Sequence, residues 1–382
     1  MKTNHSIATL LLLLSLGMTS CSTYYRMTSR IDTNGSMHRE VYARGDSAFI
    51  AGNKTHNPFL FQLDTDWQIV NLDSTLKFNF WGEEEKLNVK ACRNIPLING
   101  EYFSISNGKE QMSSLAIPTE QLKKCFKWFY TYYIYTATYK ELPDKGPVPL
   151  DKYLNKEEQI IWFRGDNAAF SGMNGIEQND KLDKLEAKFG EWYNRSQYEV
   201  IWEVLRQFTS QKGDTVYVNR LNELKETVYT NHLSGKDSCG DAGIDDVCAL
   251  FDKVGQTNYY LELYKAHAKA MDNMCEQKIK IAEVFYHAIQ FELTMPGTLL
   301  SSNASLSTNN IMVWKIDGLR LLTGNYVLTA ESRVINYWAF GLTLLIILAT
   351  LGIFIKLYRK DNKKKHSDNY LNAFLSGLAS FF

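Results

Sequence analysis

The densest group of side chains that could do chemistry lies between residues 234 and 248. Cys239 and Cys248 would close a disulfide loop of about ten residues, worth about 2.5–3 kcal/mol in the chain-entropy model. Such a bond requires an oxidising compartment outside the cytoplasm. The alternative is that both residues are ordinary buried thiols. The spacing therefore predicts a possible Cys239–Cys248 disulfide.

Four aspartates share this segment: Asp237, Asp241, Asp245 and Asp246. Carboxylates are calcium ligands, but in an EF-hand loop the ligands fall on alternate residues, and these do not. A solvated acidic turn, with Asp245 near the start of a helix, accounts for the same residues. We therefore predict no metal site and keep the four aspartates as weak candidates.

The rest of the sequence contains none of the common catalytic motifs. GxSxG, HExxH, GxxxxGK[ST] and GxGxxG do not occur, which excludes the usual hydrolase, zincin and nucleotide-binding classes. Without a CxxC pair, neither a zinc knuckle nor a thioredoxin-like site is indicated. The remaining thiols, Cys92, Cys125 and Cys275, could be free or paired. We predict no catalytic residue and no cofactor.

The charge balance excludes one large class of partner. The chain of 382 residues has 42 Lys and Arg against 42 Asp and Glu. Nucleic-acid binding depends mainly on an excess of Lys and Arg over the phosphate backbone. We therefore expect no nucleic-acid partner.

An uncharged segment, residues 334–355, is the strongest signal in the chain. As a helix rising about 1.5 Å per residue, it is long enough to cross a hydrocarbon core of about 30 Å. Six basic residues follow within ten positions, and three lie in the twenty residues before it: Lys356, Arg359, Lys360, Lys363, Lys364 and Lys365, against Lys315, Arg320 and Arg333. This bias predicts a membrane-spanning helix with a cytoplasmic C-terminus.

The N-terminus predicts a second anchor. Residues 1–20 have a basic start and an apolar core too short to span a membrane, as in a secretory signal. The ending Met18-Thr19-Ser20-Cys21 resembles the lipobox of bacterial lipoproteins, although Met18 replaces the commoner Leu. The resemblance implies that Cys21 is acylated and binds membrane lipid through its acyl chains. Ordinary cleavage near Ser20, which leaves Cys21 free, is the alternative.

Residues 21–140 read as a β-rich segment. A hairpin is predicted over residues 24–50, with Asn34-Gly35 in a type I′ turn. Further strands are predicted at 59–63, 67–72, 76–81 and 87–91, and a short helix begins at Thr119. Residues 126–139 are rich in aromatic and β-branched residues, which favours a strand. That strand would be a core strand or an exposed stacking surface.

Residues 141–282 have helical periodicity, and residues 283–333 return to strands. Helices are predicted at 150–163, 180–192, 198–209, 216–229, 245–254 and 259–281. The fold class is therefore α+β: an antiparallel β-rich domain built from N- and C-terminal segments, with a helical insertion and one C-terminal transmembrane helix. If the N-terminal hairpin pairs with the terminal strands, both anchors leave from the same face.

Short motifs before the apolar segment resemble the end of a family of bacterial envelope proteins. They are Met295-Pro296-Gly297, Ser302-Asn303-Ala304, Trp314-Lys315 and Thr329-Ala330-Glu331-Ser332. These motifs resemble membrane-tethered lipoproteins of the LppM-like kind over about a quarter of the chain. The resemblance implies an extracytoplasmic α+β architecture and an association with envelope lipid. It carries over no catalytic residue.

Residues 356–382 form a basic tail with an apolar end. Leu371, Phe374, Leu375, Leu378, Phe381 and Phe382 recur at helical spacing, which predicts an amphipathic helix on the inner leaflet or in a partner's groove. A frayed end is the alternative. A one-pass sensor is disfavoured because this tail is too short for a domain.

Two functions remain. The first is a non-enzymatic envelope module that binds a lipid or an unknown membrane or periplasmic protein. The second is an enzyme whose carboxylates in the 234–246 loop act on a glycan or a lipid head group.

Overall fold

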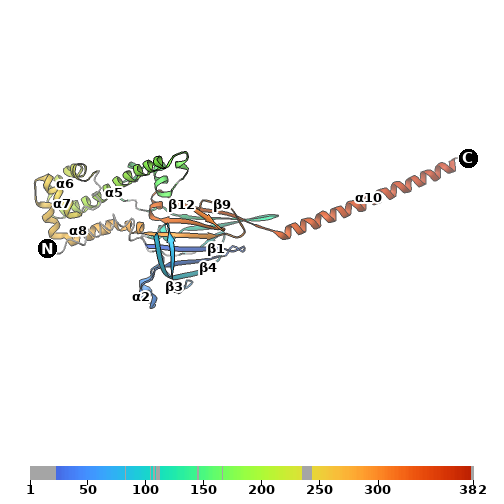
Figure 1. The fold of residues 1–382 in the computed structure, drawn as a ribbon, viewed down its shortest axis with the longest axis horizontal. Coiled ribbons are helices and arrows are strands. Elements are labelled where there is room, and N and C mark those ends of the chain that lie inside the picture. The colour runs from blue at the N-terminus through green and yellow to red at the C-terminus, as the bar shows by residue number, and fades with distance from the viewer. Residues whose placement is uncertain are drawn as a thin grey trace.

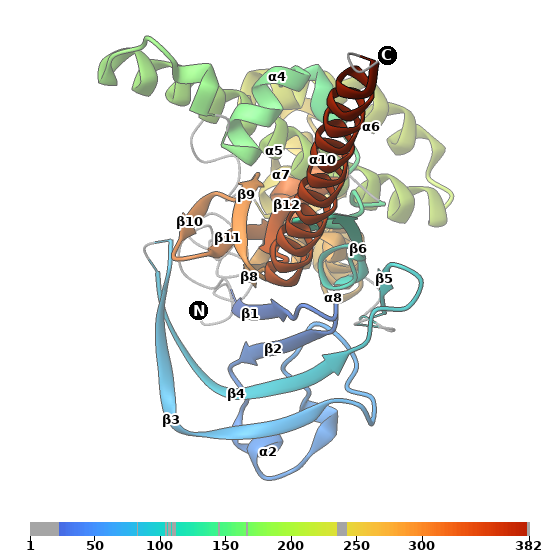
Figure 2. The same ribbon diagram turned by 90° about the vertical axis from the view of Figure 1, so that its right-hand side faces the viewer.

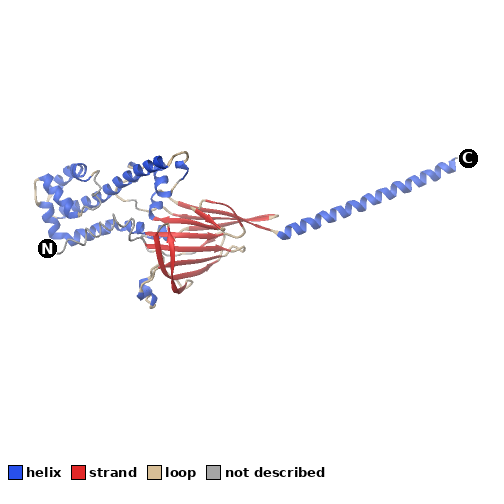
Figure 3. Ribbon diagram, in the orientation of Figure 1, coloured by secondary structure: helices blue, strands red, loops and turns tan. Residues whose placement is uncertain are grey.

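The computed structural model describes residues 23–379, except 82, 104, 106–107, 109–111, 144–145, 166 and 235–242. These residues form two packed sheets, a helical region on one side of them, and one long helix that projects from the other side (Figures 1 and 3). The fold class is α+β, as predicted.

The larger sheet has seven strands in the order β10-β11-β8-β1-β2-β4-β3. Its strands are β1 (Thr23–Ile31), β2 (Met37–Ala43), β3 (Gln68–Phe80), β4 (Glu83–Ile95), β8 (His287–Thr294), β10 (Leu306–Thr308) and β11 (Ile311–Asp317). Strand β1 lies between β2 and β8, so N-terminal and C-terminal segments are neighbours in one sheet. The pairing of β1 with β8 is parallel, and the other pairings described in this sheet are antiparallel.

The smaller sheet has the order β5-β6-β7-β12-β9. Its strands are β5 (Glu101–Tyr102), β6 (Thr119–Lys127), β7 (Tyr130–Tyr139), β9 (Thr298–Ser302) and β12 (Tyr326–Ile335). The end-on view in Figure 2 shows the smaller sheet lying over one face of the larger one. Alternate residues of both sheets fill the space between them. Phe291 of β8, for example, stacks on Tyr135 of β7, and both are fully buried.

Helices fill the segment between β7 and β8. The main ones are α5 (Gly175–Gln211), α6 (Thr215–Val228), α7 (Ile244–Gly255) and α8 (Tyr259–Ile279), and the short α4 (Lys156–Gln159) precedes them. Short helices elsewhere in the chain are α2 (Ser47–Ile50), α3 (Ser113–Ala116) and α9 (Gly318–Leu322). We call α5–α8 the helical region. It has its own apolar core around Val204, Leu221 and Phe251. Helix α5 joins the two cores, because Phe189 and Trp192 pack with the sheets instead.

The strand directions give the β domain two distinct ends. At the junction end, β12 finishes at Ile335 and the long helix α10 (Tyr337–Ala379) begins. At the helical end, β7 runs into the helical region and β8 returns from it (Figure 1). Strand β1 also starts at the helical end, because Thr23 pairs with His287. Strand β1 therefore starts at the end of the β domain remote from α10, which does not favour the expectation that both anchors leave from the same face; Cys21 itself lies outside the described residues.

Several local predictions differ from the structure at turns. The hairpin of β1 and β2 is present, but only Gly35 in its turn has a positive φ, of 98°. The Gly35 N–H donates to Asp32 O at 2.9 Å, so a type I turn closed by a left-handed glycine replaces type I′. Residues 59–63 form a loop whose aromatic side chains pack into the core. The ring of Phe61 lies 4.8 Å from that of Trp67, which follows the loop. The two strands predicted at 67–72 and 76–81 are one bulged strand, β3.

The helix predicted at Thr119 is a strand, β6. Glu120 and Leu122 point into the core while Thr119 and Gln121 face outward, which is a strand alternation. A buried glutamate concealed this alternation in the sequence. The helices predicted at 180–192 and 198–209 are one helix, α5, and Arg195 bonds Glu199 across the turn where the break was expected. Residues 150–164 form three short pieces (Leu150–Lys152, Lys156–Gln159 and Ile160–Arg164) instead of one helix.

Candidate functional site: the junction between the sheets and the apolar helix

Helix α10 grows directly out of the smaller sheet. Strand β12 pairs with β7 along its whole length, and its last two residues, Val334 and Ile335, lie opposite Thr131 and Tyr130. The apolar segment predicted from residue 334 therefore starts as strand, and the helix begins at Tyr337. Its stretch Tyr337–Leu357 is long and apolar enough to cross a membrane, judged by length and composition.

Asn336 ties the start of α10 to the β6–β7 hairpin. Its backbone N–H donates to Phe129 O at 2.9 Å, and its side-chain Nδ2 donates to Trp128 O at 3.0 Å. Its Oδ1 accepts from Thr131 Oγ1 at 3.0 Å, and its carbonyl accepts the Ala339 N–H at 2.9 Å. One residue thus satisfies both the hairpin turn and the first turn of the helix. The helix leaves the sheet in a defined direction.

A cluster of aromatic rings surrounds this connection. We call Phe126, Trp128, Phe129, Trp338 and Phe340 the aromatic collar. Phe126 and Trp338 stack at 6.1 Å with rings 4° apart, and Phe129 lies 4.5 Å from Phe340. Trp128 Nε1 donates to Thr343 Oγ1 at 2.8 Å. The collar is nevertheless exposed: Trp338 is 56% and Phe126 58% accessible.

Basic side chains flank the collar on the sheet side. Lys127 Nζ lies 5.1 Å from the centre of the Tyr132 ring, and the Arg333 guanidinium lies 4.5 Å from that of Tyr130. Lys124 Nζ donates to Thr33 O at 2.9 Å. The junction end therefore presents exposed aromatic rings with cations behind them.

The aromatic segment 126–139 divides between the two structures considered for it. Tyr133, Tyr135 and Tyr139 of β7 are buried, as in a core strand. Phe126 and Trp128 at the hairpin tip are exposed, as in a stacking surface. The sequence has the same aromatic density throughout, so only the position of the turn separates the two parts.

A buried ion pair joins the two sheets behind the junction. Arg39 of β2 donates to both oxygens of Glu120 of β6, at 2.8 and 2.6 Å, and to Ser29 Oγ at 2.9 Å. The Tyr135 hydroxyl also donates to Glu120. Burial lowers the pKa of Arg39, but the charge of Glu120 and the bonds to it leave that pKa raised. Both charged side chains are at most 1% accessible, so the pair fixes the packing of the sheets and meets no solvent.

The outward face of the larger sheet carries a half-buried set of charges. Arg26 Nε donates to Glu292 at 2.8 Å, and Lys90 Nζ donates to Glu40 at 2.7 Å. Burial acts to raise the pKa of Glu40, but its bonds from Lys90 and Tyr42 lower it overall. These charges are paired across neighbouring strands, which is the ordinary way a sheet face is stabilised.

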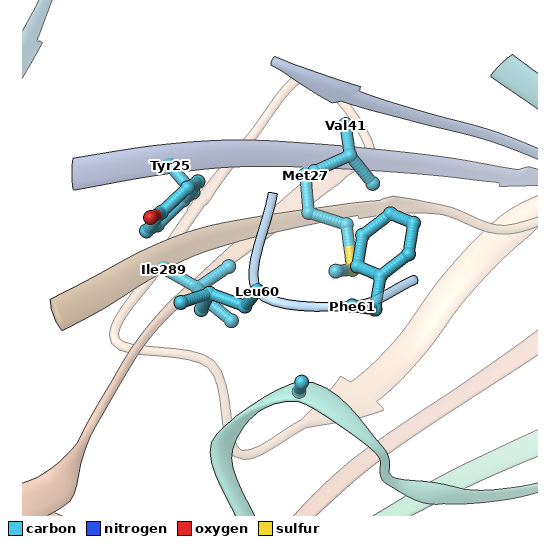
Figure 4. Close-up of a pocket in the computed structure, with 7 residues that line it drawn as sticks. Tyr25, Met27, Val41, Leu60, Phe61 and Ile289 are labelled. Atoms are coloured by element: carbon cyan, nitrogen blue, oxygen red, sulfur yellow. The ribbon is translucent and has the colours of Figure 1, made fainter. Parts of the chain in front are cut away.

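A small apolar cavity lies between the larger sheet, the loop at Leu60 and Phe61, and helix α3 (Figure 4). Its lining includes Tyr25, Met27, Leu60 and Ile289. Its free volume is about 10 Å³, about the space that one water molecule needs. This cavity cannot take an acyl chain.

The predicted site residues fall partly outside the described residues. Cys21, Cys239, Asp237 and Asp241 lie there, so lipidation and the Cys239–Cys248 disulfide stay predictions. Cys248 is fully buried on α7, and burial raises the pKa of its thiol. Among the residues described, no three His, Cys, Asp or Glu come together as metal ligands.

The two described aspartates start a helix. Asp245 and Asp246 lie in the first turn of α7, where Asp246 Oδ2 accepts the Gly243 N–H at 3.1 Å. Carboxylates at this position interact favourably with the positive end of the helix dipole and accept hydrogen bonds from N–H groups that have no partner within the helix.

Asn336 and the Arg39–Glu120 pair were not predicted from the sequence, because only folding brings their partners to them.

Comparisons with known proteins add little. No family model matches the chain, and no curated protein matches it. Among solved structures, the chain is similar to the folded domain of the LppM protein of Mycobacterium tuberculosis, determined by NMR. The two are 8% identical, the match covers 82% of this chain and 91% of that chain, and the TM-score is 0.23. At that score the likeness carries no argument about this chain.

Proposed function

We propose that the chain is a non-enzymatic module anchored in the bacterial inner membrane by α10, which carries its helical region away from the bilayer toward a protein partner. The observation that carries this proposal is the junction. Strand β12 continues into α10, and Asn336 binds the helix start to the β6–β7 hairpin. A module that only needed tethering could use a loose linker.

The basic residues after the apolar stretch support an extracytoplasmic β domain. Lys356 and Arg359 follow it directly, and Lys360 and Lys363–Lys365 come soon after. Positive residues are retained on the cytoplasmic side. The tail would then meet the inner leaflet, and the helical region would face the periplasm.

The position of β1 bears on the second anchor. Eight paired residues separate Thr23 from the junction end of β8, or about 25 Å at about 3.3 Å per residue. Cys21 precedes Thr23 by two residues, a reach of about 7 Å. Acyl chains on Cys21 and the helix α10 enter one bilayer only if the strands lie along its surface. We propose α10 as the anchor that sets the orientation.

The enzyme alternative has less support. Its carboxylates in the 234–246 loop include Asp245 and Asp246, which serve the start of α7. Two carboxyl groups in the helical region have a raised pKa, mainly through burial, but each has a structural partner. Asp252 accepts the Tyr260 and Leu261 N–H groups, and Asp272 accepts the Tyr264 hydroxyl.

A photo-crosslinking amino acid tests the proposal. Val216 on α6 is 75% accessible, and Trp81, between β3 and β4, is 40% accessible. Placed at Val216 in native membranes, the crosslinker should give one discrete protein adduct, and at Trp81 it should not. The full chain should also be extracted from the membranes by detergent but not by alkaline carbonate, as expected of a protein anchored by a membrane-spanning helix. Release by carbonate, or no adduct at Val216, would contradict the proposal.

A further inference from the structure

The tip of the β6–β7 hairpin reaches alongside α10 rather than ending at the sheet. Trp128 bonds Thr343, which is six residues beyond Tyr337, or about 9 Å further along the helix axis. Phe129 contacts Phe340 at 4.5 Å. A hairpin belonging to the β domain therefore lies beside the first two turns of a helix that is apolar all round.

That depth matches the layer between lipid head groups and acyl chains. The head-group layer on each side is about 5–8 Å thick, half the difference between a whole bilayer and its hydrocarbon core. If Tyr337 marks the outer surface, Trp128 lies at the base of this layer. Tryptophan favours this depth because its ring is apolar and its N–H is polar.

The charges fit an anionic surface. Lys124 and Lys127 of β6 and Arg333 of β12 lie on the sheet side of the collar, and each holds its cation near a tyrosine ring. Long basic side chains at an interface keep their stems on apolar surface and their charge among the head groups. Each adds to the attraction of this end toward an anionic leaflet.

We propose that the hairpin tip, residues 126–129, is a second membrane-inserting element that enters the outer leaflet beside α10, with anionic head groups against Lys124, Lys127 and Arg333. This inference rests on the proposed anchoring of α10. The exposed collar is then covered by lipid. The hairpin and the helix enter together, which prevents the β domain from tilting about Asn336.

Tryptophan quenching in lipid nanodiscs tests the proposal with the full chain. The discs contain phosphatidylglycerol and lipids brominated in the upper acyl chain, which quench only tryptophans at that depth. Trp128→Phe should remove about half of the quenchable emission, since Trp128 and Trp338 are the two tryptophans at the interface. Trp81→Phe is the matched control: Trp81 is 40% accessible and Trp128 41%, but Trp81 follows β3 at the helical end. It should change nothing.

Trp338→Phe separates this inference from the proposed function. If it lowers the quenching and Trp128→Phe does not, α10 is inserted but the hairpin lies outside the lipid, and the inference is wrong. If neither substitution matters, α10 itself is not in the bilayer, and both proposals fail. A near-ultraviolet circular dichroism spectrum like that of the parent shows that each variant is folded, because it depends on the packing of buried aromatic residues such as Trp314.

A separate experiment tests the role of the basic side chains. Lys124→Glu with Lys127→Glu should reduce the quenching of Trp128 in discs with phosphatidylglycerol and have less effect in zwitterionic discs. Lys86→Glu, an exposed lysine of β4 at the helical end, is the matched control. Equal quenching of the double variant and the parent in anionic discs would overturn the assignment of these lysines to lipid head groups.

Discussion

The two ends of the β domain differ in how far their aromatic side chains are exposed. At the junction end, aromatic rings such as Trp128 and Trp338 stay more than 40% exposed although they contact one another. At the helical end, rings such as Tyr198 and Phe251 are almost fully buried in a second core. Aromatic side chains are therefore used as surface at one end and as core at the other.

The two ends of the β domain suit different surroundings. The helical region buries apolar faces of its helices in a core of its own. The junction end leaves rings uncovered beside an apolar helix, which water would penalise and a lipid interface would not. The sheets between them transmit a fixed geometry, because they are closed by Arg39 and Glu120.

Breaking that buried pair should have the largest effect. Arg39→Met leaves Glu120 charged and unpaired between the sheets, which costs about 3–5 kcal/mol. We expect the β domain to unfold at lower denaturant than the parent, while the helical signal from the second core persists to higher denaturant. Circular dichroism measures the two transitions, with the far ultraviolet following the helices and the near ultraviolet following the packing of the aromatic side chains. Arg39→Met with Glu120→Leu should recover much of the loss, and a single joint transition would contradict the separation of the two cores.

Asn336→Ala should have a smaller, local effect at the junction end. It removes two side-chain hydrogen bonds, to Trp128 O and from Thr131 Oγ1, worth about 1–2 kcal/mol together. Amide exchange at residues 129–131 should therefore accelerate about tenfold.

Asn303→Ala is the control for this change. Asn303 also bonds the backbone of β12, donating to Val327 O and accepting from the Thr329 N–H. It lies away from the hairpin tip, so its loss should leave exchange at residues 129–131 as in the parent. Unchanged exchange in Asn336→Ala would show that Asn336 does not hold the junction.

The smallest effect concerns the pH response of the helical end. Burial raises the pKa of Asp272, Glu276 and Asp245 add to this, and the Tyr264 hydroxyl opposes it. The folded pKa then exceeds the unfolded value of about 3.9. The stability from this group is full below that value and is lost as the pH rises through the raised pKa.

Asp272→Asn should remove this loss. We expect its Tm to exceed that of the parent by roughly 1–2 °C at pH 7 and to converge with it below about pH 4. Asp183→Asn, on the exposed face of α5, is the matched control and should change neither Tm. A gain that is equal at both pH values would mean that charge is not its cause.

The sequence alone determined the features that depend on local composition. The apolar stretch before Lys356, the alternation in β2 and β8, and the periodicity of α6 and α7 are each written within about twenty residues. The spacing of apolar residues shows whether a segment is buried on one face or on all faces, and this indicates its type of secondary structure. For that reason the α+β class could be predicted.

Other features depend on residues that are distant in the sequence and meet only in the folded chain. The local sequence around Glu120 predicted the start of a helix. In the structure Glu120 is buried in a strand, where it pairs with Arg39, 81 positions away. The parallel pairing of β1 with β8 places Thr23 at the end remote from α10, and no local pattern encodes strand direction. Nothing in the local sequence marks Asn336 as special, because its partner Trp128 in the hairpin turn lies 208 positions away. Hydrogen bonds and ion pairs of this kind depend on geometry that forms only when both segments have folded.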